Sequence, residues 1–144
     1  MAGGKLNLIT SLSRVYRFSA AHRLHTDAMS EVDNKAVYDK CHNISGHGHD
    51  YTLEVTVRGN PDPESGMIIS LTEFDAAVNS VLNKLDHRHL DLEVDYFKNN
   101  ISTGEMIIQY LWNELNPLFP KDKLYHLKLW ETNNNYFELG KDLY

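Results

Sequence analysis

The sequence predicts an α+β fold with a mainly antiparallel sheet of about four strands, and three observations lead to it. Apolar and polar residues alternate with period two at 15–22 and again at 51–57, which is typical of half-buried strands. Two later stretches, 71–85 and 107–115, place apolar residues at helical spacing. Apolar and polar residues alternate once more at 125–131, before a turn, and this pattern predicts a closing hairpin. Strands that pair around a few helices belong to the α+β class.

Length and composition are those of one ordinary domain. All 144 residues are expected to form it, with residues 1–13 as a frayed lead-in. Hydrophobic residues make up 42% of the chain and no apolar run could span a membrane. The net charge of -6, without a basic cluster, argues against a nucleic acid or an anionic membrane as partner. A single cysteine excludes an internal disulfide and predicts a cytoplasmic location.

The first strand carries a histidine on its apolar face. Tyr16, Phe18, Ala20 and His22 share one parity, so His22 is expected to point toward the interior. His22 is a candidate metal ligand. The alternative is a core histidine that is hydrogen-bonded to the backbone.

Residues 24–45 follow without periodicity and are mostly polar. We expect a long connection without regular structure, and such a connection inside a compact domain is usually functional or disordered. Because it leads to Cys41, His47 and His49, the functional interpretation is favoured.

The two histidines after this connection are one residue apart. His47 and His49 continue the parity of the strand at 51–57, so both imidazoles are expected on its interior face. Catalytic zinc usually takes three protein ligands and leaves a position open, and His22 would supply the third. Zinc is the first expectation, although imidazole also suits other transition metals. The alternative is a His-Gly-His turn without a ligand role.

Cys41 has two interpretations. Beside a bound metal ion the pKa of the thiol would fall, and the thiolate could accept a proton. Alternatively, Cys41 joins the three histidines in a closed tetrahedral site that is purely structural. A zinc–sulfur distance of about 2.3 Å would identify the second case.

The second half of the chain has recognisable helix boundaries. Ser70 with Glu73, and Ser102 with Glu105, match the capping-box pattern at the starts of the two helices, and Pro117 ends the second helix.

A turn cluster at 59–66 allows 67–69 to resume pairing as a hairpin. The sheet is left with two edges, which natural proteins cover, charge or pair with another chain. A symmetric oligomer is consistent with this pattern.

Three further polar residues are candidates for the chemistry. Asp86 beside His87 suggests an acid–base relay, and the alternative is an exposed pair at a helix end. Glu131 shares the face of the apolar residues of its strand, where a carboxylate needs a partner. It could accept two hydrogen bonds from a guanidine-like heterocycle edge, or lie in water at the strand end.

Together these motifs resemble the 6-pyruvoyl-tetrahydropterin synthase family. The resemblance runs from about Arg14 to Glu138 and rests on five segments in the same order: Phe18-Ser19-Ala20-Ala21-His22-Arg23, Cys41 followed by His47-Gly48-His49, Leu85-Asp86-His87, Ser102-Thr103-Gly104-Glu105 and Trp130-Glu131-Thr132. It implies a tunnelling fold, with a four-stranded antiparallel sheet, two helices on one face, trimers that close a barrel, and a homohexamer of two trimers.

The resemblance also implies an activity. It is that of a zinc-dependent lyase, with Mg2+ as a further ion, which converts 7,8-dihydroneopterin triphosphate to 6-pyruvoyl-tetrahydropterin and releases triphosphate in tetrahydrobiopterin biosynthesis. Carried over by position, the zinc ligands are His22, His47 and His49, and the other site residues are Cys41 as proton acceptor, Asp86 and His87 as relay, Glu131 as pterin anchor and Thr103 as a further substrate contact.

Two alternatives stay open. The 6-carboxytetrahydropterin synthases of the queuosine pathway share the fold and the zinc triad, but they typically have a shorter spacing between the cysteine and His-Gly-His than Cys41 and His47 have here. A non-catalytic zinc module would require Cys41 as a ligand. One departure from the family is Gly104, which stands where a threonine is common.

Overall fold

The computed structural model describes residues 8–143 and places a single five-stranded sheet at its centre. The strand order is β3-β1-β2-β4-β5. Four strands are antiparallel, and the two-residue β3 runs parallel to β1. The α+β class is confirmed, and β3 is an addition to the predicted sheet. The strands are β1 (Thr10–His22), β2 (His47–Gly59), β3 (Arg88–His89), β4 (Leu124–Thr132) and β5 (Asn135–Gly140).

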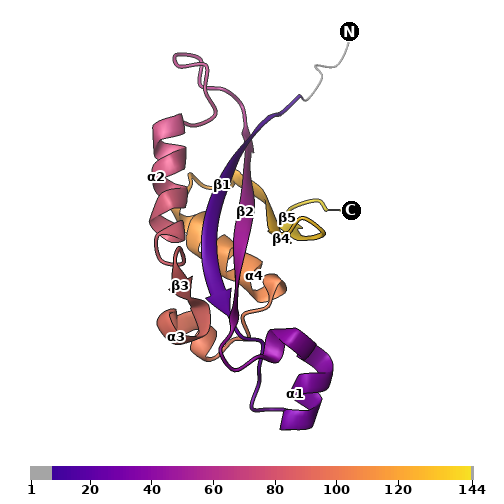
Figure 1. Cartoon of the computed structure of the whole chain (residues 1–144). Coiled ribbons are helices and arrows are strands. Elements are labelled where there is room, and N and C mark those ends of the chain that lie inside the picture. The colour runs from indigo at the N-terminus through magenta and orange to yellow at the C-terminus, as the bar shows by residue number, and fades with distance from the viewer. Residues whose placement is uncertain (1–7, 144) are drawn as a thin grey trace.

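Two helices pack on one face of the sheet, and smaller helices lie at one end of it (Figure 1). The packed helices are α2 and α4, both predicted, and their apolar sides share one core with the strands. Helix α1 lies beyond the end of the β1–β2 hairpin (Figure 1). The helices are α1 (Glu31–Tyr38), α2 (Leu71–Leu82), α3 (Leu90–Glu93) and α4 (Gly104–Leu115), with 3-10 turns η1 (Asp39–His42), η2 (Asp95–Lys98) and η3 (Asn116–Leu118).

The core lies between the sheet and these two helices. Leu53 and Leu129 from the sheet, Phe74 from α2 and Ile107 from α4 are fully buried in one cluster. Burying each such side chain stabilises the fold by about 1.5–3 kcal/mol. This layer holds the strand ends in place, and the candidate site is built on them.

The connection after β1 is more ordered than its sequence predicts. It contains α1 and η1 rather than a structureless loop. Ser30 caps α1 by accepting from the Asp33 amide at 3.1 Å, and the buried Asn34 side chain bonds to both the amide and the carbonyl of Thr26 at 2.8 Å. Because α1 is mostly polar and is tied down by these hydrogen bonds, it has no apolar periodicity to detect.

Strand β1 starts earlier than predicted. Thr10 pairs with Gly59, so residues 10–13 belong to the strand rather than to a lead-in. Residues 1–7 lie outside the described residues. The predicted strand at 67–69 is wrong, because this segment bends, and the Met67 carbonyl closes a turn by accepting from the Asp62 amide at 2.9 Å.

Strand β4 contains two bulges, and the first changes the predicted parity at the start of the strand. At the first, the pairing shifts so that Leu124 is buried opposite Val57, while Tyr125 lies under the Arg58 guanidinium, 4.1 Å away. At the second, Glu131 has no partner on β5, because the ladder steps from Trp130 directly to Thr132. Bulges are common next to active sites, and the second one lies at a candidate site residue.

The N-cap of α4 also differs from the prediction. Thr103, rather than Ser102, accepts from the Met106 amide at 3.3 Å. The Ser102 hydroxyl instead donates to Asp91 at 2.8 Å. The cap of α2 is confirmed, since Ser70 accepts from the Glu73 amide at 3.4 Å. When two hydroxyl residues are adjacent, the cap pattern alone does not decide between them.

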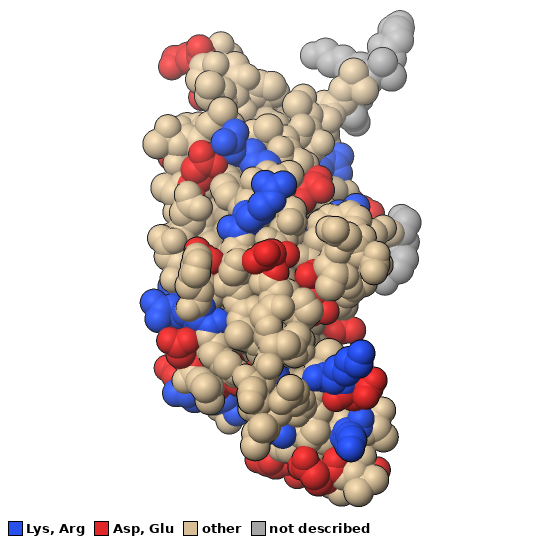
Figure 2. All heavy atoms as spheres, in the orientation of Figure 1, with Lys and Arg blue, Asp and Glu red and all other residues tan. Residues whose placement is uncertain are grey.

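The distribution of charged side chains on the surface agrees with the lack of a basic cluster in the sequence. On the face shown in Figure 2, Lys and Arg side chains are interspersed with Asp and Glu, without a continuous basic area there. Among the described residues, the helices are all too short or too polar to cross a membrane.

A hydrogen-bonded group ties β1 to α2 and makes stability depend on pH. Asp75 accepts from the Tyr16 hydroxyl at 2.6 Å and from Arg14 Nε at 2.9 Å. The Tyr16 bond, followed by Arg14, holds the pKa of Asp75 below its ordinary value. A lowered folded-state pKa contributes stability above the unfolded value, and this contribution is lost as pH falls through the folded value.

We therefore expect Asp75→Asn to lower the urea midpoint at about pH 7 and to lower it by less at about pH 3, because below the ordinary pKa of about 3.9 the unfolded parent chain is largely protonated and part of the contribution is lost. Urea titrations at both pH values test this. Glu64→Gln, in the exposed turn before α2, is the control. An equal deficit of Asp75→Asn at both pH values would contradict the assignment.

Candidate active site

Three histidines converge where β1 ends and β2 begins. His22 is the last residue of β1 and pairs in register with His47, the first residue of β2. Their Nε2 atoms are 3.0 Å apart, and the ligand atoms of His22, His47 and His49 all lie within 4.8 Å of one another. The prediction that these side chains share one face is confirmed. The arrangement suits a single ion with imidazole ligands.

Hydrogen bonds orient the His22 ring toward the place where the three histidines converge. Its Nδ1 donates to the Ser102 carbonyl at 2.7 Å, which leaves the lone pair on Nε2, facing His47. Ser102 is held by Asp91, which also accepts from the Arg23 amide at 2.7 Å. Outer contacts of this kind fix the tautomer of metal-binding histidines. Ser102 and Asp91 were not identified from the sequence, where Ser102 had a sufficient role as a cap.

The surroundings of His22 and His47 favour neutral imidazole. Burial lowers the pKa of His22, against the opposing hydrogen bond to Ser102. Burial, followed by the neighbouring His22, lowers the pKa of His47. The buried His47 Nδ1 has no hydrogen-bond partner among the described residues. Neutral imidazole is the form that binds metal, so His22 and His47 fit an ion, and the position of His49 completes the set of three.

Cys41 lies beside the histidines but outside their cluster. It is half-buried on η1 and lines a cavity of about 670 Å³ together with His47 and His49. It is not part of the set whose ligand atoms lie within 4.8 Å of one another, which argues against a closed four-ligand site. Burial, followed by Glu131, raises the pKa of the Cys41 thiol. A cation at the histidines would act in the opposite direction.

Glu131 lies on the same side of the sheet. Its charge raises the pKa of Cys41 and of Tyr51, in both cases after burial, so its carboxylate is near both. Tyr51 is fully buried, stacks on Phe18 at 4.8 Å and has a hydroxyl without a partner among the described residues. Tyr51 was read from the sequence only as a strand residue, although its position two residues after His49 on the same face was a usable signal.

Asp86 and His87 form a pair, but they lie elsewhere in the chain. His87 Nδ1 is 3.0 Å from Asp86 Oδ1, and the hydrogen bond from the Ser19 amide, followed by His87, holds the pKa of Asp86 below its ordinary value. The His87 side chain is 83% exposed and adopts a φ of 60°, in a region that is strained for a residue with a Cβ.

His87 borders a shallow hollow of about 350 Å³ with Ser19, Gly48, His49 and Asp50, and Asp86 does not line it. Neither residue of the pair lines the cavity of Cys41. The structure therefore brings Asp86 and His87 together, but does not bring them to Cys41 within one chain.

Gly104, the first residue of α4, stands where a threonine is common in the family, and the structure gives a steric reason for this glycine. The Thr103 hydroxyl is used as the N-cap. A Cβ on Gly104 would lie 2.0 Å from the ring of Phe137 on β5. The Phe137 ring occupies the space that a threonine side chain would need.

Comparison with known proteins supports these observations. The family model for 6-pyruvoyl tetrahydropterin synthase matches residues 11–142. The 6-pyruvoyl tetrahydrobiopterin synthase of Poecilia reticulata is 42% identical over 125 residues, covering 86% of this chain and 85% of its own. The solved Caenorhabditis elegans 6-pyruvoyl tetrahydropterin synthase superposes with a TM-score of 0.89 at 38% identity, covering 94% of this chain and 97% of its own.

A relative with a different activity in its name also matches. The dihydroneopterin monophosphate aldolase of Pyrococcus furiosus is 30% identical over 132 residues, covering 90% of this chain and 94% of its own. The family model and the more similar relatives agree over nearly the whole described chain. This chain belongs to the 6-pyruvoyl tetrahydropterin synthase family of enzymes.

Proposed function

We propose that this chain converts 7,8-dihydroneopterin triphosphate to 6-pyruvoyl-tetrahydropterin and releases triphosphate, a step of tetrahydrobiopterin biosynthesis. One observation carries the proposal within this family. The imidazoles of His22, His47 and His49 converge, and His47 and His49 line the cavity that also holds Cys41. A metal site beside an independent thiol is suited to removing protons from a polyol side chain.

The ion is proposed to be zinc, because three imidazoles are a common ligand set for catalytic zinc. When bound, zinc polarises the hydroxyl groups of the substrate side chain and makes the neighbouring protons more acidic. Ser102 and Asp91 keep His22 in the tautomer that this ligand set needs. The requirement for Mg2+ stays a prediction from the family resemblance.

Cys41 is proposed to accept the proton from the carbinol carbon of the substrate side chain. Its position outside the histidine cluster leaves the sulfur free for this role. Glu131, which lies at the β4 bulge, accepts two N–H groups from the guanidine-like edge of the pterin ring. Thr103 contributes a further contact. The ring gains the hydrogens that the side chain loses, so the reaction needs no external redox cofactor.

The Asp86–His87 pair is proposed to return a proton in a cavity of a neighbouring chain. His87 is exposed, neither residue lines the Cys41 cavity of its own chain, and the family resemblance predicts a homohexamer. Mixing Cys41→Ala chains with His87→Ala chains, each nearly inactive alone, then restores part of the turnover, because some sites combine intact residues from both. Two inactive variants that stay inactive after subunit exchange would contradict this arrangement.

The product identifies the reaction. We expect zinc-loaded protein under reducing, oxygen-free conditions to give a pyruvoyl pterin and free triphosphate by mass spectrometry. A second candidate is the aldolase cleavage of the side chain, which the Pyrococcus furiosus relative favours and which would leave a hydroxymethyl pterin. A carboxylated pterin with acetaldehyde would identify the queuosine-pathway activity. Either of these products, or unchanged substrate, would overturn the main proposal.

A cytoplasmic location is proposed from the single cysteine.

A further inference from the structure

A second cluster of metal-binding side chains lies apart from the three site histidines. His25 follows β1, Glu31 begins α1, and His42 ends η1. Their ligand atoms all lie within 4.8 Å of one another. His42 is buried and His25 is half-buried. None of these three residues has a part in the reaction proposed above.

The imidazoles of His25 and His42 approach each other through their Nδ1 atoms. His25 Nδ1 and His42 Nδ1 are 3.4 Å apart, whereas the ring centres are 5.1 Å apart. The nitrogens are therefore the near edges of the two rings. Two nitrogens bound to one tetrahedral zinc at about 2.0–2.1 Å would be roughly 3.3 Å apart.

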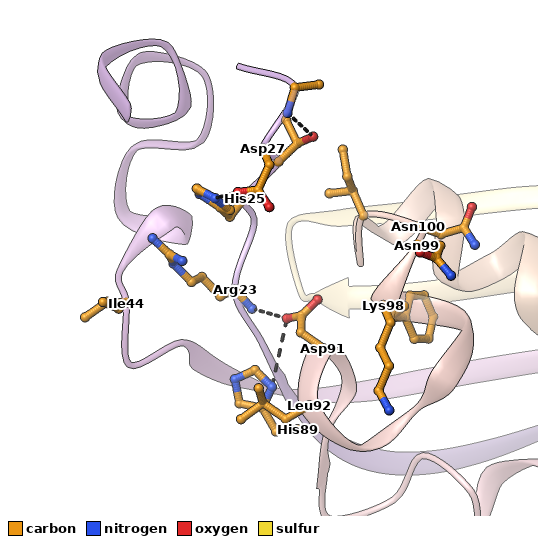
Figure 3. Close-up of a pocket in the computed structure, with 14 residues that line it drawn as sticks. Arg23, His25, Asp27, Ile44, His89, Asp91, Leu92, Lys98, Asn99 and Asn100 are labelled. Atoms are coloured by element: carbon orange, nitrogen blue, oxygen red, sulfur yellow. Dashed lines mark hydrogen bonds and ion pairs between the residues drawn. The ribbon is translucent and has the colours of Figure 1, made fainter. Parts of the chain in front are cut away.

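Carboxylates hold the outer nitrogens of both rings. His25 Nε2 lies 2.9 Å from Asp27 Oδ1, and the two side chains are joined at the edge of the cavity in Figure 3. His42 Nε2 lies 2.6 Å from Glu31 Oε1. A carboxylate accepts, so each Nε2 carries the hydrogen, and in neutral imidazole the lone pair is then on Nδ1. In this tautomer both Nδ1 lone pairs lie on the near edges of two rings that are stacked with an angle of 18° between their planes.

We propose that His25 and His42 bind one divalent transition-metal ion through their Nδ1 atoms, with Asp27 and Glu31 as the carboxylates that orient the rings. Histidine ligands in proteins almost always donate their second N–H to such a partner. Zinc is the probe of choice, and imidazole suits copper, nickel and cobalt as well. Water completes the coordination.

The neighbouring charges permit a cation. Arg23 Nη2 lies 3.3 Å from His42 Nε2 and 3.5 Å from His42 Nδ1 and opposes the ion, whereas the carboxylates of Asp27 and Glu31 act in its favour. The Leu24 carbonyl, 3.3 Å from His42 Nδ1, adds another oxygen on the same side.

This position connects the second ion to the candidate active site. His42 follows Cys41 directly, and the Leu24 amide donates to the Cys41 carbonyl at 2.7 Å. His42 and Glu31 line the Cys41 cavity, while His25 lines an adjacent cavity of about 560 Å³ (Figure 3). An ion here would join η1 to the segment after β1 and fix the backbone that carries Cys41. We assign it a positioning role.

Metal counting tests the proposal without any turnover measurement. After dialysis against zinc, the parent chain is expected to hold two ions by mass spectrometry, and His25→Ala and His42→Asn one each. His47→Ala should lose the other ion. His126→Ala, a histidine on β4, is the matched control and should keep both. One ion in the parent chain, or two in His25→Ala, would overturn the proposal. Since counting needs no pterin, it can fail or succeed independently of the proposed activity.

Two further measurements cover variants that fold poorly. Asp27→Asn changes a fully exposed side chain, and it is expected to weaken the second ion by about 10–100-fold. In nitrogen-15 spectra of metal-free protein, His25 and His42 should both be Nε2–H tautomers, and zinc should shift their Nδ1 signals. An Nδ1–H tautomer for either ring, or Nδ1 signals that zinc leaves in place, would overturn the assignment.

Discussion

Replacing Cys41 by alanine is expected to lower kcat by about 10²–10⁴-fold while zinc at the three histidines is retained. This is the range that a general base contributes to a proton transfer. Cys41 lines the same cavity as His47 and His49 but is not part of the histidine cluster, so its loss removes a proton acceptor and no ligand. The expected result is thus a lower kcat with an unchanged zinc content.

Steady-state kinetics and metal analysis on the same preparation measure both quantities. Ser45→Ala is the matched control, because Ser45 is an exposed residue of the same segment that lines neither this cavity nor the histidine cluster. Loss of zinc together with turnover would mean that Cys41 is a ligand. Unchanged turnover would mean that another group accepts the proton.

Gly104→Ala is expected to destabilise the fold by about 1–3 kcal/mol, the usual cost of overpacking. In most helices this substitution stabilises by about 0.5–1 kcal/mol. Here the new Cβ would lie 2.0–2.5 Å from three atoms of the Phe137 ring, so β5 or the start of α4 must move. For a chain of this size, the melting temperature should fall by roughly 2–4 °C per kcal/mol.

A double-mutant cycle separates the clash from other causes. If the ring is responsible, Gly104→Ala costs less in a Phe137→Ala background than in the parent chain, by at least about 1 kcal/mol in urea or thermal unfolding. Gly48→Ala is the control for stability, because its Cβ would meet only the Ala20 carbonyl at 3.7 Å. Additive costs in the cycle would exclude the clash as the cause.

The strands and the packed helices could be predicted because their signals are local. Period two at 15–22 and 51–57 reports a buried face whatever the rest of the chain does, and the helical spacing after Ser70 is equally local. Helix α1 has no such signal, since it is mostly polar and is tied to the chain by Asn34. The β4 bulges depend on partners in β2 and β5, and no pattern within β4 reveals them.

The candidate site also has features that local sequence predicts and features that only the folded chain reveals. The shared face of His47 and His49 follows from their spacing. The position of His22 opposite His47 depends on the register of two strands that are joined by a long connection. Whether Cys41 belongs to the histidine cluster is a question of distance, and residue types left it open. His25 and His42 lie within the stretch that lacks periodicity, so only the folded chain brings them together.

The His22–His47 pair ends the β1–β2 ladder, and beyond it the two strands separate. Ladder ends are where strands fray. An ion held by both histidines acts there as a reversible cross-link between the strand ends. By mass action, free metal at about 100 times its dissociation constant adds roughly 2.7 kcal/mol to the free energy of unfolding. Amide exchange at the end of the hairpin should therefore accelerate when the ion is chelated, so the order of this strand end becomes a readout of metal supply.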